Sequence, residues 1–164
     1  MSPGRLVIDK AAIVAVGILV VDQATKIASF GAVETGEQLS LLPGISISET
    51  RNEGIAFGMF SGRPWIVFGL MFTALAVLVW FYVRNRARPI LWLATGMLLG
   101  GALGNAIDRL SLGYVRDFVD LPHWPSFNVA DVAITMGVVM LVFAADSKPQ
   151  GEDKRVEADD HAAN

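Results

Sequence analysis

The chain has 164 residues, of which 53% are hydrophobic and 18% are charged, and its formal net charge is -3. A charged fraction below the roughly 25% of soluble domains indicates a membrane protein, and the small net charge argues against nucleic-acid binding. The chain has no cysteine, which excludes disulfides, thiolate nucleophiles and cysteine-ligated metals. Zinc-peptidase and nucleophile-elbow motifs are also absent from the sequence.

Four apolar stretches predict four transmembrane helices, at about 6–30, 64–83, 89–108 and 128–146. A helix needs roughly 20 residues to cross the ~30 Å hydrocarbon core. The first stretch is expected to be a retained span, because "DQATK" follows it where a cleaved signal peptide would have small residues. Residues 1–146 are therefore predicted to form a single integral membrane domain. The polar residues 147–164 are predicted to form a disordered cytoplasmic tail.

The two predicted outer loops are 31–63 and 109–127. In the first, "ISISE" (45–49) alternates as a short strand does, and Pro43-Gly44 before it predicts a turn, so we expect a small extracytoplasmic sheet. "IAFGMF" (55–60) predicts a short interfacial segment. The second loop is expected to hold Asp117 and Asp120.

Basic residues predict the orientation. Three arginines crowd the link at 84–88, and further basic residues precede the first span and follow the last. With four spans, these places lie on one side of the membrane, which the positive-inside rule makes the cytoplasm. Both termini are then cytoplasmic. Tryptophans near the predicted span ends fit an interfacial belt.

Polar residues gather at the predicted outer ends of the spans, and such residues usually mark function in membrane proteins. Most have a structural interpretation too. Asp22 and Lys26 are four apart and can pair on a helix. Asn105 is suited to cross-linking helices, and Asn128 to capping one. Gly96, Gly100 and Gly104, at four-residue spacing, predict close helix packing.

Asp117 and Asp131 are harder to explain structurally. Asp131 lies about one turn inside the last span, and Asp117 lies between Val115 and Phe118. Two carboxylates that meet in a partly dry pocket share a proton, so one can polarise water while the other protonates a carbonyl. From the residues alone, an aspartic peptidase and a proton or ion pathway both remain open.

Five short blocks resemble lipoprotein signal peptidase, also called signal peptidase II, a family of bacterial membrane aspartic peptidases. They stand in the family's order over about residues 8–146: "DQATK" (22–26), "RNEGIAFG" (51–58), "GGALGNAIDR" (100–109), "VRDFVD" (115–120) and "FNVADVAI" (127–134). The resemblance implies an all-α membrane protein, a four-helix transmembrane bundle with a small outer sheet and a short outer helix. It also implies a multi-pass protein of the bacterial cytoplasmic (inner) membrane, with its active site near the outer leaflet.

The resemblance also implies residue roles. The catalytic dyad falls on Asp117 and Asp131, and the supporting or substrate-binding residues fall on Asp22, Lys26, Asn52, Gly54, Asn105, Asp108, Arg109, Asn128 and Ala130. The implied partners are lipid-modified prolipoproteins, cut on the amino side of a diacylglyceryl-cysteine, and membrane phospholipids. No metal or organic cofactor, nucleic acid or obligate protein partner is expected. Arg116 departs from the family, where an apolar residue is more usual; its guanidinium is expected to face either the dyad or lipid headgroups.

Two other classes of protein are alternatives to a peptidase. A proton- or cation-coupled transporter would use the same aspartates and Lys26, but the polar residues cluster on one side and no internal repeat is visible. A non-catalytic membrane scaffold would be insensitive to replacement of Asp117.

Overall fold

The structure is a computed structural model that describes residues 3–34, 36–54, 63–84 and 91–146. These residues form four helices and four strands. In chain order the elements are α1 (Pro3–Ala32), β1 (Gln38–Leu42), β2 (Ile45–Asn52), α2 (Pro64–Arg84), α3 (Leu91–Leu112), β3 (Val115–Leu121), β4 (Trp124–Phe127) and α4 (Val129–Asp146). Each helix overlaps one of the four apolar stretches.

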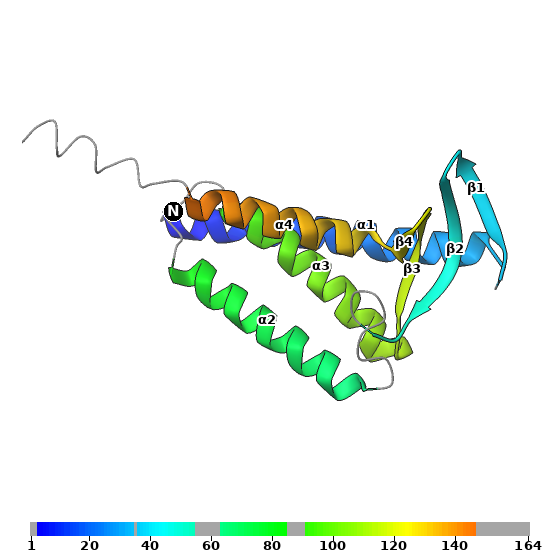
Figure 1. Ribbon diagram of the computed structural model, residues 1–164. Coiled ribbons are helices and arrows are strands. Elements are labelled where there is room, and N and C mark those ends of the chain that lie inside the picture. Colours follow the sequence, from blue (N-terminus) through cyan, green and yellow to red (C-terminus); the bar gives the residue numbers. More distant parts are fainter. Residues whose placement is uncertain (1–2, 35, 55–62, 85–90, 147–164) are drawn as a thin grey trace, which may run out of the picture.

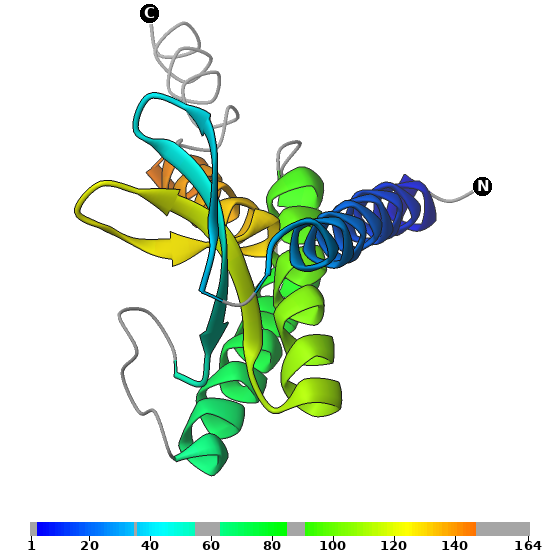
Figure 2. The same ribbon diagram turned by 90° about the vertical axis from the view of Figure 1, so that its right-hand side faces the viewer.

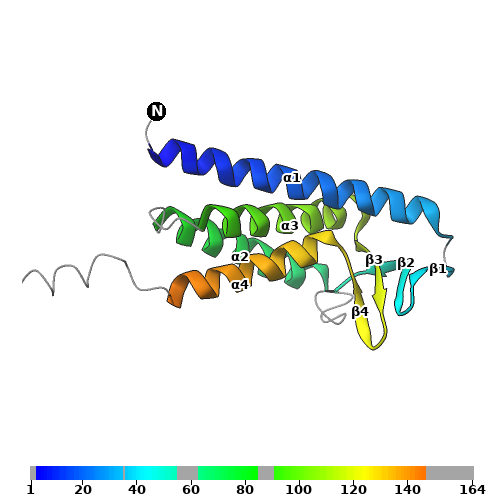
Figure 3. The same ribbon diagram turned by 90° about the horizontal axis from the view of Figure 1, so that it is seen from above.

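The helices run alternately in opposite directions, and the sheet lies at the end where α1 and α3 finish and α4 begins (Figures 1 and 3). The N-terminus lies at the other end (Figure 1). Within the described residues, one helical segment, Lys10–Ala32, is long and apolar enough to cross a membrane. Val129–Phe143 is a shorter apolar helix.

Helix α3 is the centre of the packing, with α1 on one side and α4 on the other (Figure 3). Its glycines allow this closeness, as the four-residue spacing predicted. A β-carbon at Gly96 would lie 2.7 Å from the carbonyl oxygen of Ala11, and one at Gly100 would lie 2.6 Å from that of Ala15. Gly104 is different, because its nearest neighbour is the carboxylate of Asp22.

The sheet is antiparallel in the order β1-β2-β3-β4 and stands in front of the helices when the molecule is viewed from that end (Figure 2). The predicted strand and turn are confirmed: β2 contains 45–49, and Gly44 has the positive φ of 82° that the turn after Leu42 requires. Figure 2 also shows that the β1–β2 and β3–β4 hairpins lie side by side.

The sequence places Asp117 in the second outer loop but does not predict its secondary structure. Asp117 lies within β3, opposite Thr50 of β2. The pattern concealed this strand, because a register shift between Ile47 and Thr50 interrupts the pairing and both faces of β3 are partly covered. The described residues between α1 and α2, and those between α3 and α4, contain no helix. The predicted interfacial segment 55–60 lies outside the described residues.

Candidate active site

Asp117 is a buried carboxylate held between two neutral amides. Its side chain belongs to β3 and is 1% exposed. Asn128 donates from Nδ2 to Oδ1 of Asp117 at 2.6 Å, and Asn52 of β2 donates from Nδ2 to Oδ2 at 2.9 Å. Both oxygens therefore have a fixed donor, and neither donor carries a formal charge.

Asp131 is held by the start of α4. The backbone N–H of Asn128 donates to Oδ2 of Asp131 at 3.2 Å, while Oδ1 of Asn128 accepts from the Asp131 N–H at 3.0 Å. This reciprocal pair is a capping box, with Asn128 as the N-cap. The predicted cap is thus confirmed. Asn105 of α3 donates to the other oxygen of Asp131 at 2.8 Å.

Asn128 consequently bonds both carboxylates. Its side-chain nitrogen donates to Asp117, and its backbone N–H donates to Asp131. The two carboxylates come from separate elements, yet they lie within reach of one residue that is fully buried. Burial raises the pKa of Asp117 to about 6, and the charge of Asp131 acts in the same direction. The hydrogen bonds from Asn52 and Asn128 lower this pKa and limit the rise.

Arg109 and Gly54 reach Asp117 through Asn52. Arg109, at the last turn of α3, donates to the carbonyl oxygen of Gly54 at 2.6 Å. The N–H of Gly54 donates to Oδ1 of Asn52 at 2.9 Å, which turns the Asn52 amide nitrogen toward Asp117. The first outer loop is thereby attached to the end of α3.

Lys26 and Asp22 form the predicted pair, but they belong to a larger buried cluster. Lys26 Nζ lies 2.9 Å from Asp22 and 3.3 Å from Asp108, and it donates to Asn105 at 2.9 Å. Asp22 also accepts from the backbone N–H of Ala130 at 2.9 Å, so it anchors the first turn of α4. Asn105 cross-links helices, as predicted.

Arg116 adopts neither of its two expected orientations, and both are therefore corrected. Its guanidinium points away from the dyad and into the protein, where it contacts Asp108 at 2.7 Å and Gln23 at 2.9 Å. Gln23 is a residue that the sequence reasoning missed, although it stands inside the "DQATK" block. Its amide nitrogen lies within 3.2 Å of both Asp22 and Asp108.

A row of hydroxyl groups on the sheet was also missed. Thr50 contacts Ser126 at 3.1 Å and Ser48 at 3.4 Å, and Ser126 donates to Asp120. The alternation in "ISISE" was the available signal, because it places the serines on one face of β2. Asp120 thus takes part in the hydrogen bonding of the sheet.

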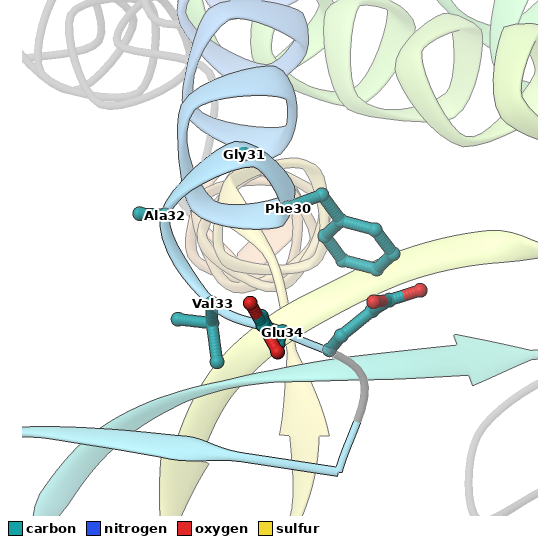
Figure 4. A pocket seen from close by; sticks show the side chains of 6 residues that line it. Phe30, Gly31, Ala32, Val33 and Glu34 are labelled. Atoms are coloured by element: carbon teal, nitrogen blue, oxygen red, sulfur yellow. The ribbon is translucent and has the colours of Figure 1, made fainter.

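Two of the cavities among the described residues are lined without Asp117 or Asp131. One, of about 510 Å³, lies at the end of α1 and is lined by Phe30, Gly31, Ala32, Val33, Glu34 and Glu49 (Figure 4). Another, of about 440 Å³, lies over the hairpins and includes Asp120. Across the described part of the chain, no group of three or more His, Cys, Asp or Glu side chains is placed to hold a metal ion.

The helices and the small sheet together correspond to the fold of a class of bacterial membrane enzymes. One solved structure, described as a bacterial membrane enzyme determined by the in meso method at 2.3 Å resolution, is 31% identical with a TM-score of 0.79, covering 87% of this chain and 93% of that one. A second, described in the same way at 1.9 Å, is 31% identical with a TM-score of 0.76, covering 85% of this chain and 94% of that one.

The sequence comparison identifies the family. Residues 14–145 match the profile of the family described as signal peptidase (SPase) II, and the chain belongs to this family. Similar curated proteins are each named lipoprotein signal peptidase. That of Syntrophomonas wolfei is 37% identical, covering 76% of this chain and 85% of that protein. That of Syntrophotalea carbinolica is 40% identical, covering 80% and 88%. Family membership makes the chain a membrane peptidase.

Proposed function

We propose that this chain is an aspartic endopeptidase that removes signal peptides from diacylglyceryl-modified prolipoproteins, cutting on the amino side of the lipidated cysteine. The observation that carries the proposal is the bridge at Asn128, which holds Asp117 and Asp131 together from two separate elements. In a member of the signal peptidase II family, a buried aspartate and a half-buried one so joined are suited to activate water.

The proposed reaction needs one proton shared by the dyad. The ionised carboxylate takes a proton from water, whose oxygen attacks the scissile carbonyl carbon, while the protonated carboxyl gives its proton to the carbonyl oxygen. The resulting diol collapses as the C–N bond breaks and the leaving amine takes a proton. The raised pKa of Asp117, about 6, supports a dyad that holds this proton in mildly acidic to neutral solution.

The other predicted site residues have supporting roles in this proposal. Asn52, Asn105 and Asn128 orient the carboxylates, and Gly54 with Arg109 holds Asn52. The cluster of Asp22, Lys26 and Asp108 joins α1 to α3, and Asp22 holds α4 at Ala130. Asn52 and Gly54 are also proposed to lie over an extended substrate.

We further propose that α1–α4 form a four-helix transmembrane bundle, with residues 1–146 as one domain. The lengths of α2 and α3, 21 and 22 residues, support this, since roughly 20 residues cross the hydrocarbon core. The sheet and the start of α4 lie at the end opposite the N-terminus (Figure 1). They carry Asp117 and Asp131, respectively. With both termini cytoplasmic, the site faces the outer leaflet, where it meets prolipoprotein substrates and phospholipids.

The test is a cleavage assay in nanodiscs with a diacylglyceryl-modified prolipoprotein and its unmodified form. Wild type, Asp117→Asn and Asp131→Asn are compared, and Asp120→Asn provides the matched control on the same strand. We expect wild type and Asp120→Asn to cut the lipidated form alone, and both dyad variants to lose at least about 1,000-fold in kcat, as catalytic groups of this kind do.

Two results would contradict the proposal. Clear turnover by both folded dyad variants would remove the aspartic mechanism. A folded wild type that cuts neither substrate would remove the peptidase function, and proton flux in liposomes would then test the transporter alternative.

A further inference from the structure

Arg116 uses both its backbone and its guanidinium to fasten the chain immediately before Asp117. Its backbone N–H donates to Asp108 Oδ2 at 3.0 Å, and its carbonyl oxygen accepts from Asn128 Nδ2 at 3.4 Å. Its guanidinium bonds both oxygens of Asp108, at 3.2 and 2.7 Å, and Gln23 at 2.9 Å. Strand β3 is thereby tied to α1, α3 and the start of α4 at one residue.

Arg116 also completes the charge balance behind the site. Asp22, Lys26 and Asp108 have fully buried side chains, and by themselves they carry one negative charge in excess. The side chain of Arg116, 14% exposed, adds the second positive charge. A buried carboxylate that loses its partner is strongly destabilised or takes up a proton, so this balance matters more here than on a surface.

We propose that Arg116 is a positioning residue, which orients Asp117 through the backbone and keeps the charge behind the dyad at zero. The inference rests on the proposed catalytic role of Asp117. An apolar residue at this position would have neither the forked donor nor the charge.

The charged groups around Asp117 determine the expected direction of the pH effect. Asp131 faces it from α4, Lys26 from α1, and Asp108 and Arg109 from α3. On β2, Arg51 stands directly opposite Arg116 but pairs with Glu49 at 2.6 Å. Loss of the Arg116 charge leaves one uncompensated negative charge near the dyad, which favours the protonated carboxyls and moves their titration to higher pH.

The experiment measures kcat, KM and their pH profiles in nanodiscs for wild type and four variants. Arg116→Met removes both the fork and the charge, while Arg116→Lys keeps the charge alone. Arg116→Met combined with Asp108→Asn removes both charges of the pair. Arg51→Met, in the cross-strand neighbour, is the control for loss of an arginine from the sheet.

For Arg116→Met we expect kcat to fall at least about tenfold with KM within about threefold, and both limbs of the profile to move alkaline by about half a pH unit or more. Arg116→Lys should lose kcat but keep the wild-type profile, since lysine cannot make the bidentate contact. The pH profile of the double variant should return to the wild-type position, while its kcat should stay as low as that of Arg116→Met. Arg51→Met should behave as wild type.

Wild-type kcat and an unmoved profile in folded Arg116→Met would overturn the inference, while cleavage by wild type would leave the proposed function standing. An equal effect of Arg51→Met would also overturn it. If Arg116→Met does not fold, Arg116→Lys decides, because unchanged kcat in that variant contradicts positioning by the fork. Absence of cleavage by wild type would instead refute the function, and the inference with it.

Discussion

Asn128 joins the two aspartates of this site, and the oxygen and nitrogen of its side-chain amide have separable tasks. As N-cap it stabilises the first turn of α4, and as a side-chain donor it orients Asp117. Serine can accept the capping hydrogen bond but is too short to reach the carboxylate of Asp117. The two tasks can therefore be separated by substitution.

Replacing Asn128 by alanine should cost about 1 kcal/mol of stability through the lost cap and lower kcat about 10- to 100-fold through the lost donor. Asn128→Ser should recover most of the stability but not the activity. Thermal unfolding in detergent and the cleavage assay measure the two effects. Recovery of activity by Asn128→Ser would show that the cap alone matters.

The titration of Asp117 makes stability depend on pH. Its pKa is about 6 in the folded protein and about 3.8 in the unfolded chain, so protonation favours the folded state. That stabilisation is complete below pH 4 and is lost as the pH rises through 6, up to roughly 3 kcal/mol.

Asp117→Asn lacks this titration, so its melting temperature should fall less than that of wild type between pH 4.5 and 7.5. Thermal unfolding of both proteins in the same detergent at the two pH values provides the comparison. Asp120→Asn, from the same strand, should follow wild type. Equal falls in wild type and Asp117→Asn would contradict the raised pKa.

Helix α3 determines how closely the elements around the site approach. Gly100 and Gly96 bring α1 against one face of α3, and Gly101 lies against the backbone at Ala130. Asp22 of α1 can reach the first turn of α4 only because the helices are this close. Helix packing and site geometry are thus coupled at α3.

Gly100→Ala should destabilise the protein by about 1–3 kcal/mol, because the new methyl group would lie 2.6 Å from the Ala15 carbonyl oxygen. Gly17→Ala is the matched control, since nothing lies within 4 Å of a β-carbon there, and it should be neutral or gain up to about 1 kcal/mol. Thermal unfolding distinguishes the two. Equal stability of both variants would mean that α1 and α3 are less closely packed.

At the scale of the whole molecule, the polar chemistry lies at one end. The sheet lies where α1 and α3 finish, away from the N-terminus (Figure 1). Asp117 belongs to this sheet, Asp131 to the first turn of α4, and the ion cluster of Asp22, Lys26 and Asp108 adjoins them through Ala130 and Arg116. In the proposed transmembrane arrangement, this end lies on the outer side of the bilayer. Because the chain has no cysteine, single-cysteine variants can report that orientation without background.

Ser40→Cys, on exposed β1, should react with a membrane-impermeant maleimide in intact spheroplasts. Lys10→Cys, at the opposite end of α1, should react only after the membrane is permeabilised. Mass spectrometry or a gel shift measures the labelling. Labelling of Lys10→Cys in intact spheroplasts would contradict the cytoplasmic position of the N-terminus.

Local patterns were sufficient to predict several parts of this protein. The apolar stretches predicted the helices, and the turn at Gly44, the Asp22–Lys26 pair and the cap at Asn128 follow from short-range rules. The turn, the ion pair and the cap each depend on residues at most four positions apart. The family blocks added the roles of Asp117 and Asp131, which remain a proposal.

Only the tertiary structure decided which distant residues meet. Strand β3 was hidden because its pairing with β2 is irregular, and the partners of Arg116 lie 8 and 93 residues away in the sequence. Spacing and hydropathy describe one segment at a time, whereas a buried charge takes whichever partner packing brings near. The sequence by itself therefore determined the helices and the polar residues of the site. Packing around α3 decided which of those residues bond to one another.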